Sequence, residues 1–275
     1  MNLNFISPTK PLTMQTTHFL TTLFILSLSI VLNGQNPELS PQSIHSHNDY
    51  QKEEPFWNAF NHKVGIIEVD LYYHEGKVVV AHDPSELEKP ISFEEKYLKP
   101  LKHLMKENNS YPYPDTALDL AVMFDIKNER NAVMDWILDV YEENPDVFDT
   151  RKPVKIVISG NRPEPDSWLY LPENVYIDGR LTDPIYASEQ ASLRDKVFIV
   201  SSSYRVIGNW NGIGECPPSE QEKIRKIVGR VHSAGLKLRF WGNRDTEAFW
   251  DLLLENGVDI IGTDDVERLV NYLGT

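Results

Sequence analysis

The sequence predicts an α/β protein, a single (β/α)8 TIM barrel, closed or slightly distorted, that follows an N-terminal signal peptide. Short apolar β-type runs alternate with helical patterns about eight times along the chain, which indicates parallel strands closed into a barrel. Residues 35–275 have about the length typical of such barrels. An open doubly wound sheet is the alternative, but no Gly-rich phosphate loop or dinucleotide fingerprint follows any of the predicted strands.

Residues 1–34 have the pattern of a secretory leader. Lys10 is the only charged residue before residue 35, and it precedes an apolar run at 19–32. That run is shorter than the roughly 20 residues that a membrane span needs, so we expect cleavage near Gly34 and no stable span afterwards. An uncleaved membrane anchor is the alternative. Cys216 is the single cysteine, so an intrachain disulfide is excluded. An exported chain without disulfides is typical of a bacterial protein of the periplasm or extracellular space.

The net charge of −14 argues against nucleic acid as the main partner. It leaves room for a small anionic substrate drawn to a bound cation.

The predicted strands cover residues 66–72, 77–82, 120–127, 154–160, 175–178, 197–200, 236–241 and 259–263. In a barrel the chemistry lies at the carboxyl ends of the strands. Polar or aromatic residues stand at or just past such ends, namely His47, Asp70, Asp125, Arg162, Asp178 and Trp241.

Two carboxylates share one face of a predicted central strand, because Glu68 and Asp70 are two residues apart. Buried carboxylates are costly unless they are paired or bind a metal ion. A salt bridge to a neighbouring lysine or arginine is the simpler explanation. Together with Asp125 and Asn48 they form an all-oxygen set, which favours Mg²⁺ or Ca²⁺ over zinc.

Three histidines accompany these carboxylates. His82 ends an apolar run a dozen residues after Asp70, where a catalytic role competes with a structural one. His45 and His47 share a face if the chain is extended, so one could be a base and the other a ligand or an orienting group. The unperturbed pKa of histidine lies near neutrality, which suits acid and base catalysis.

Three further residues are candidates for substrate binding. Lys127 shares a face with Asp125 and could neutralise a phosphate oxygen, or simply pair with the carboxylates. Arg162 could bind phosphate through two parallel hydrogen bonds, or pair with Asp178. Trp241 could form the floor of the substrate pocket, or pack inside the barrel.

The His-x-His pattern at a first strand also suggests an amidohydrolase-type metal hydrolase. Such sites need further histidines at later strand ends. The corresponding segments here, 177–180 and 200–203, contain no histidine, which makes a dinuclear histidine-rich site hard to build.

These motifs resemble the phosphatidylinositol-phospholipase-C-like phosphodiesterase superfamily, which includes glycerophosphodiester phosphodiesterases. The segment 46–50 resembles the opening of the phospholipase C catalytic domain, and Glu68-x-Asp70 with His82 matches the shared Glu-x-Asp…His pattern. The strongest resemblance is to the "altered inheritance of mitochondria protein 6"-like branch. It rests on His-Ser-His-Asn-Asp-Tyr at 45–50, Ile-Ser-Gly-Asn-Arg-Pro at 158–163, Asp-Gly-Arg at 178–180 and Leu-Arg-Phe-Trp at 238–241.

The resemblance implies a metal-dependent phosphoric diester hydrolase that acts on a small-molecule or lipid phosphodiester, and the leader pattern predicts that it is exported. It implies one Mg²⁺ or Ca²⁺ at Glu68, Asp70 and Asp125, and a histidine pair for acid–base work. His47 is favoured as the base, with His45 as its rival. The His-Arg-Gly and Pro-Glu-Asn segments of glycerophosphodiesterases are missing, so glycerophosphodiester specificity does not follow. A barrel that binds a phosphorylated ligand or lipid headgroup without turnover is the alternative.

Overall fold

The computed structural model of the chain describes residues 40–274 and the isolated Met1. The predicted signal peptide, residues 1–34, lies outside the described residues and stays a prediction. In the part of the chain that the structure describes, no helix is long and apolar enough to cross a membrane.

Eight parallel strands form a closed barrel, as predicted. The ring closes because the first strand pairs with both the second and the last, through His45 beside Ile66 and Ser46 beside Thr263. The strands of the ring are β1 (Ile44–Ser46), β2 (Ile66–His74), β4 (Leu120–Ile126), β5 (Val154–Gly160), β6 (Val175–Gly179), β7 (Val197–Ser203), β8 (Leu238–Trp241) and β9 (Ile260–Thr263).

The predicted strand at 77–82 is shorter than expected and is not part of the ring. It forms β3 (Lys77–Val80), which pairs antiparallel with the end of β2. The hairpin turns at Glu75 and Gly76, both in the left-handed region with φ of 49° and 80°. The chain then returns to the barrel, where the backbone N–H of Ala81 donates to the carbonyl of Asp70 at 3.2 Å. The hairpin therefore brings His82 back beside Asp70.

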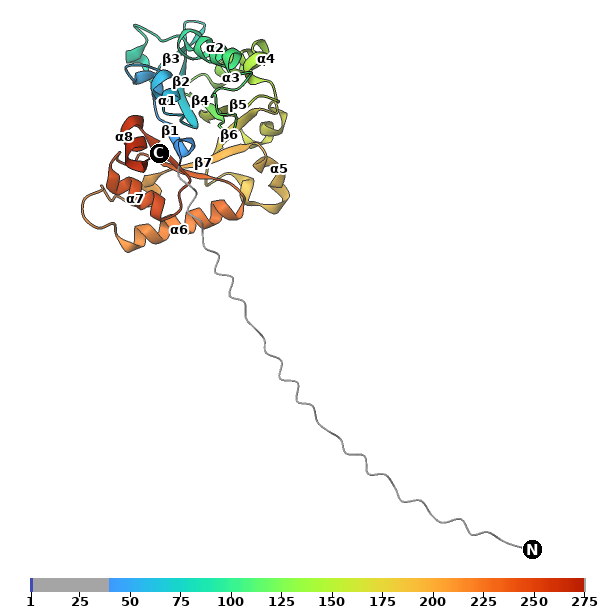
Figure 1. Ribbon diagram of the computed structural model, residues 1–275, viewed down its shortest axis with the longest axis vertical. Coiled ribbons are helices and arrows are strands. Elements are labelled where there is room, and N and C mark those ends of the chain that lie inside the picture. The colour runs from blue at the N-terminus through green and yellow to red at the C-terminus, as the bar shows by residue number, and fades with distance from the viewer. Residues whose placement is uncertain (2–39, 275) are drawn as a thin grey trace. The chain divides into compact units, whose positions relative to one another are not determined.

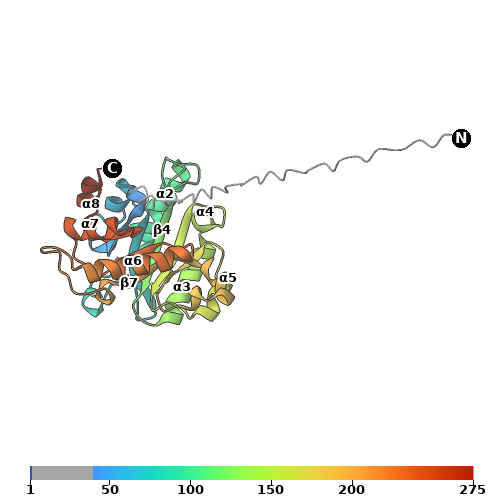
Figure 2. The same cartoon turned by 90° about the horizontal axis from the view of Figure 1, so that it is seen from below.

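Helices surround the strands, and α6, α7 and α8 follow one another along one side of the body (Figures 1 and 2). The helices are α1 (Trp57–Asn61), α2 (Lys99–Glu107), α3 (Arg130–Glu143), α4 (Pro145–Phe148), α5 (Ala191–Arg194), α6 (Pro218–Ser233), α7 (Glu247–Glu255) and α8 (Val266–Leu273). Between β5 and β6 the described chain has only the 3-10 helix η5 (Pro165–Tyr170) instead of an α-helix. This is where the barrel departs from a regular (β/α)8 pattern.

Two apolar clusters form the core. The larger one lies between the strands and the helices, and it takes the outward side chains of β2, such as Ile67, Val69 and Leu71. The smaller one fills the interior of the barrel. Its buried members are Ile66, Ala121, Met123, Val157, Ile199 and Ile260.

The interior of the barrel changes from apolar to polar towards the carboxyl ends of the strands. Side chains alternate along a strand, so Glu68 and Asp70 follow Ile66 on the inner face of β2. Asp125 likewise follows Met123 on β4. The apolar cluster thus forms a floor beneath a group of buried polar side chains.

Candidate metal centre and its histidines

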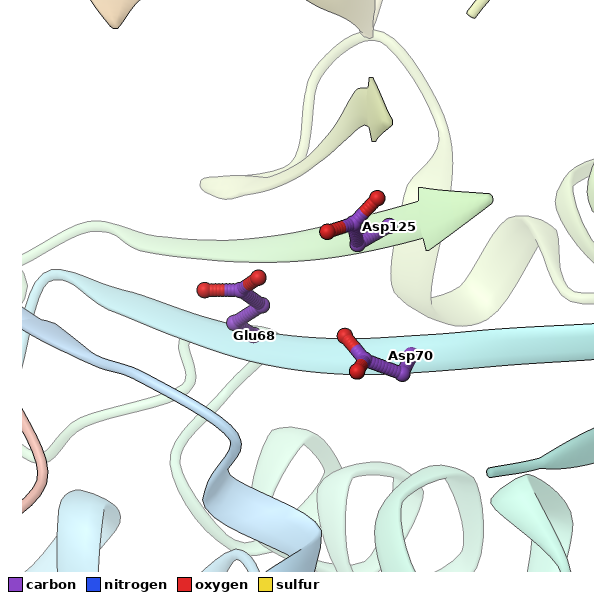
Figure 3. A group of neighbouring side chains, drawn as sticks. All are labelled: Glu68, Asp70 and Asp125. Carbon is purple, nitrogen blue, oxygen red and sulfur yellow. The ribbon is translucent and has the colours of Figure 1, made fainter. Parts of the chain in front are cut away.

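Three carboxylates converge at the mouth of the barrel (Figure 3). Glu68 and Asp70 come from β2 and Asp125 from β4, and the register of these strands sets Asp70 beside Asp125. One oxygen from each of the three lies within 4.8 Å of the other two. Neighbouring parallel strands therefore bring together the carboxylates that the sequence predicted.

The arrangement leaves two buried oxygens free. Asp70 Oδ1 and Asp125 Oδ1 have no hydrogen-bond partner among the described residues. Burial raises the pKa of Asp70, and the nearby charge of Glu68 adds to the effect. Burial also raises the pKa of Asp125 to about 6, although the charge of Lys127 opposes the change. Buried and unpartnered carboxylate oxygens are ligands that a hard cation such as Mg²⁺ or Ca²⁺ accepts.

Lys127 lies between two of the carboxylates. Its Nζ is 2.9 Å from both Asp70 Oδ2 and Asp125 Oδ2. Burial opposes its charge, but the two carboxylates outweigh that effect and raise the pKa of Lys127. The lysine therefore stays a cation, and it contacts Oδ2 of each carboxylate while Oδ1 of each stays free.

His82 contacts the same oxygen of Asp70 as Lys127 does. Its Nδ1 lies 2.6 Å from Asp70 Oδ2, and the Tyr50 hydroxyl donates to the same oxygen at 3.1 Å. Glu86 fixes the backbone of His82, because the N–H of His82 donates to its carboxylate at 2.6 Å. The imidazole is 49% exposed. One ring nitrogen is thus anchored to the carboxylate group while the ring reaches solvent.

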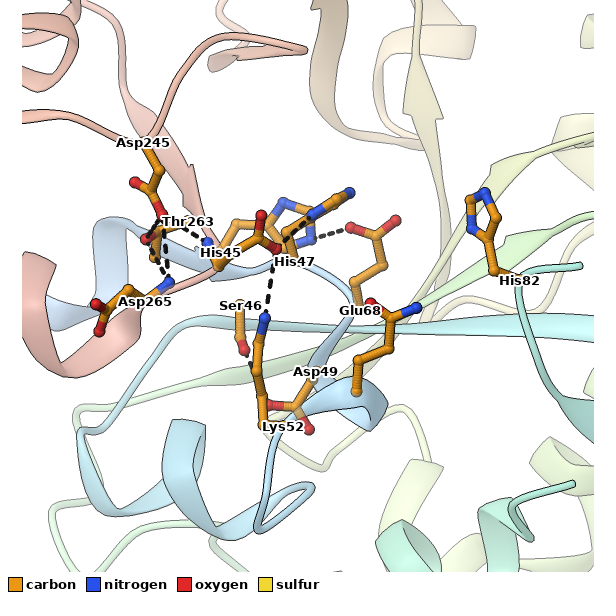
Figure 4. Close-up of polar contacts among 12 residues, drawn as sticks. His45, Ser46, His47, Asp49, Lys52, Glu68, His82, Asp245, Thr263 and Asp265 are labelled. Atoms are coloured by element: carbon orange, nitrogen blue, oxygen red, sulfur yellow. Dashed lines mark hydrogen bonds and ion pairs between the residues drawn. The ribbon is translucent and has the colours of Figure 1, made fainter. Parts of the chain in front are cut away.

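The two histidines of His45-Ser46-His47 have different environments (Figure 4). His45, on β1, is completely buried, and its Nε2 lies 2.8 Å from Glu68 Oε2. The guanidinium of Arg239 contacts its Nδ1. Burial and the charge of Arg239 lower the pKa of His45 to about 4, so the ring is neutral near pH 7. A neutral ring here accepts from Arg239 and donates to Glu68.

Arg239 was missing from the sequence prediction. It follows Leu238 on β8, is 5% exposed, and its Nε donates to the Ser201 hydroxyl at 3.1 Å. Its Nη1 lies 3.7 Å from Glu68 and its Nη2 lies 3.9 Å from Asp178. Burial disfavours the charge of Glu68, but the contact with His45 and the charge of Arg239 keep the pKa of Glu68 below its usual range. A signal was present in the sequence, because an arginine at an inward position of a barrel strand needs buried acids around it.

His47 lies at the mouth of the barrel instead. Its backbone N–H donates to the carbonyl of Thr263 at 3.0 Å, and its Nδ1 lies 3.0 Å from Asp264 Oδ1. The side chain is 42% exposed. Burial would lower its pKa, but the hydrogen bond to Asp264 and the charge of Glu68 outweigh burial and raise the pKa of His47.

Asp264 is a second residue that the sequence prediction missed. It is held by Asp245, whose Oδ2 accepts from the backbone N–H of Asp264 at 2.8 Å and from the Thr263 hydroxyl at 2.6 Å. The loop after β9 is therefore fixed, and it presents a carboxylate to one nitrogen of His47. Figure 4 shows His47 on one side of Glu68 and His82 on the other.

Asn48 follows His47 with a left-handed backbone, φ 46°. Its Oδ1 is buried and has no partner among the residues that the structure describes. An unpartnered buried amide oxygen suits a cation ligand as a carboxylate does. The predicted ligand set of Glu68, Asp70, Asp125 and Asn48 thus fits a divalent cation by its donors, and three of its oxygens are free for one.

Arg162 does not have the free guanidinium that phosphate binding would need. It is 7% exposed and pairs through Nη2 with both oxygens of Asp183, at 2.7 and 2.8 Å. The alternative considered for it, a pair with Asp178, does not form either. Asp178 instead accepts from the Ser159 hydroxyl at 2.9 Å.

Trp241 ends β8 at the mouth and is half exposed. It lines a small pocket together with His47, Asn243 and Asp264. The indole therefore borders the same opening as His47, rather than packing inside the barrel.

Comparisons with known proteins point in the same direction as this geometry. Residues 33–154 match the model of the AIM6-like phosphodiesterase domain. The resemblance to that branch of the phosphatidylinositol-phospholipase-C-like superfamily is confirmed. A relative called altered inheritance of mitochondria protein 6 homolog, from Arthroderma benhamiae, is 24% identical over 84% of this chain and 84% of its own length. Altered inheritance of mitochondria protein 6 from Eremothecium gossypii is 23% identical over 83% of this chain and 69% of its own.

A solved structure is similar in fold to this chain. A glycerophosphodiester phosphodiesterase from Parabacteroides distasonis superposes with a TM-score of 0.51 at 13% identity, over 84% of this chain and 95% of its own. That likeness supports the barrel fold. The matched domain and the fold together support a phosphodiester hydrolase.

Proposed function

We propose that the chain is an exported phosphoric diester hydrolase that works with one divalent cation, Mg²⁺ or Ca²⁺. The observation that carries this proposal is the convergence of Glu68, Asp70 and Asp125 at the barrel mouth, with buried oxygens that no described residue satisfies. A cation bound there would supply positive charge next to the phosphoryl group and stabilise the charge that develops on its oxygens.

His47 is the proposed general base. In the neutral ring, Nδ1–H donates to Asp264, which leaves Nε2 without a proton and able to accept one. It would take the proton of the nucleophile, either a water molecule or a hydroxyl of the substrate itself. His45 cannot serve in this way, because its ring is fully buried and both of its nitrogens are engaged.

His82 is the proposed general acid. Its Nδ1 is held by Asp70, so a proton on Nε2 would be directed away from the carboxylates and towards the half-exposed side. That proton would go to the leaving oxygen as the phosphorus–oxygen bond breaks. Lys127, fixed between Asp70 and Asp125, adds positive charge close to the reacting group.

The substrate is proposed to be a small-molecule or lipid phosphodiester, with Trp241 beside the group that enters the mouth. The test is a panel of lipid and soluble phosphodiesters, incubated with Mg²⁺, with Ca²⁺ or with a chelator, with products identified by phosphorus NMR. We expect one diester to be cleaved with a divalent cation and none with the chelator. Binding of a panel member without cleavage would instead favour a binding barrel, and cleavage in the chelator would remove the metal.

Export is proposed from the leader pattern at 1–34. Expression of the whole chain in a bacterial host, followed by N-terminal sequencing of the periplasmic and culture-fluid protein, tests it. We expect a mature chain that starts near Gln35. Full-length protein that stays with the membrane fraction would favour an uncleaved anchor.

A further inference from the structure

Arg180 continues the inward face of β6 at the mouth of the barrel. Tyr176 on that strand packs against the apolar floor, and Asp178 is buried above it. Because side chains alternate along a strand, Arg180 takes the next inward position, just past the end of β6. Unlike Arg162, it is exposed to solvent.

The guanidinium of Arg180 reaches back to the end of the neighbouring strand. Its Nη2 donates to the carbonyl of Gly160 at 2.5 Å. Gly160 in turn borders Asp125, since a methyl group built at Gly160 would come within 1.8 Å of Asp125 Oδ1. Gly160 therefore lies between the guanidinium of Arg180 and Asp125 Oδ1, which is one of the free oxygens of the carboxylate cluster.

The positive charge of Arg180 is not neutralised by an acid. Among residues 40–274 its side chain makes no ion pair, and its bond to Gly160 uses one of five donors. Of the two nearest acids in the sequence, Asp178 is buried and accepts from the Ser159 hydroxyl, and the carboxylate of Asp183 is taken by Arg162. Arg180 meets Asp183 only through its backbone N–H, at 2.6 Å.

The buried pair below gives Arg180 its position. Arg162 grips both oxygens of Asp183, and Asp183 accepts the backbone N–H of Arg180. The turn after β6 is therefore anchored to the segment after β5. In a protein of net charge −14, an anchored and unpaired guanidinium beside acidic side chains is suited to an anion that arrives from solution.

We propose that Arg180 binds the phosphoryl oxygens of the substrate, and that Arg162 is a positioning residue that acts through Asp183. This deepens the proposed function and rests on it for the identity of the anion. The planar guanidinium offers two parallel donors, which match two oxygens of a phosphate group.

The test measures inorganic phosphate binding by calorimetry, at saturating Mg²⁺, to the wild-type protein, Arg180→Gln, Arg180→Lys and Arg151→Gln. Arg151 is the matched control, because it is exposed and precedes β5 at the opposite end of the barrel. Loss of a charged hydrogen-bond donor should weaken phosphate binding by roughly ten- to a hundredfold in Arg180→Gln. Arg180→Lys should recover part of the loss, and Arg151→Gln should bind as the wild type does.

Equal phosphate affinity in Arg180→Gln and wild type would overturn the proposal, as would an equal loss in Arg151→Gln or no phosphate binding by the wild type. Turnover is measured separately on the diester panel. There, Arg180→Gln should raise KM more than it lowers kcat. Phosphate binding that depends on Arg180, in a protein that cleaves no diester, would support this site while refuting the hydrolase.

Discussion

His45 Nε2 lies 2.8 Å from Glu68 Oε2, and no part of the His45 side chain reaches solvent. The first histidine of His45-Ser46-His47 therefore contacts a carboxylate of the cluster from inside the barrel. Only the second, His47, stands where a substrate can arrive. Strand geometry explains the difference, because the two side chains share a face but lie at different depths in the barrel.

Replacing each of these histidines should separate their roles. His47→Gln should lower kcat by roughly 10²–10⁴-fold, as loss of a general base does, with an unfolding midpoint that is unchanged at pH values above the raised pKa of His47. His45→Gln should weaken Mg²⁺ binding, because Glu68 loses a partner that orients it. Calorimetric titration of Mg²⁺ and steady-state kinetics on both variants test this. The reverse pattern, with His45→Gln slow but binding Mg²⁺ normally and His47→Gln active, would contradict it.

The pKa of His47 should respond to Asp264. In the metal-free protein we expect NMR titration to give a pKa for His47 above the ordinary value of 6.5, because Asp264 and Glu68 favour the charged ring. Asp264→Asn should move this pKa down. Since the folded-state pKa is raised, the contribution of protonated His47 to stability is complete below about pH 6.5 and disappears as pH rises through the raised value. An unchanged His47 pKa in Asp264→Asn would exclude the pairing.

His82 should be essential for turnover and dispensable for folding. His82→Ala removes the proposed acid, and a loss of about 10²–10⁴-fold in kcat is expected. The half-exposed ring contributes little packing, so the thermal midpoint should change little. The oxygen of a far more acidic leaving group needs less protonation, so His82→Ala should lose much less activity on a substrate that carries such a group. Full activity of His82→Ala on ordinary diesters would rule out its role.

Cation binding should depend on the protonation of Asp125. Its pKa is raised to about 6, so the carboxyl becomes protonated as pH falls below that value, and a cation must then displace the proton. Mg²⁺ affinity measured by calorimetry should therefore decrease from pH 7 to pH 5. Asp125→Asn should bind Mg²⁺ weakly, with a smaller dependence on pH in that range. A wild-type affinity that stays constant from pH 7 to pH 5 would contradict the assignment.

The buried pair of Arg162 and Asp183 should be needed for stability. Asp183→Asn leaves a buried guanidinium without its acid, which should cost about 3–5 kcal/mol in the free energy of unfolding. The control is Asp149→Asn, whose partner Arg151 is exposed and whose pair should contribute far less to stability. Urea denaturation of both variants provides the comparison. Similar losses in the two would show that burial of the first pair does not matter.

The sequence predicted the barrel because strand and helix periodicities follow from local side-chain order. The alternation in β2 sets Glu68 and Asp70 on one face wherever the strand lies, and the carboxyl-end rule places Asp125 beside them. The absence of an α-helix between β5 and β6 was not predicted. The 3-10 helix η5 that stands there has 6 residues, too few for a helical periodicity to be recognised in the sequence. The hairpin of β3 was only partly predicted, as a strand at 77–82 that in the structure ends at Val80 and pairs antiparallel with β2.

Pairings between distant residues could not be read from the sequence. Arg239 contacts His45 across 194 positions, and Asp264 meets His47 across 217. Arg162 pairs with Asp183 and not with Asp178, because Asp178 points into the barrel and Asp183 lies on the turn beyond it. Only the closed ring, which brings β8 and β9 next to β1, determines these contacts.

The most direct test of a metal-dependent phosphodiesterase compares wild type with Asp125→Asn on the diester that the panel identifies, by phosphorus NMR at saturating Mg²⁺. Circular dichroism of both proteins verifies equal folding. We expect conversion of the diester signal by the wild type and no detectable conversion by Asp125→Asn. Equal conversion by the two proteins would contradict it, and so would a wild type that converts no diester of the panel.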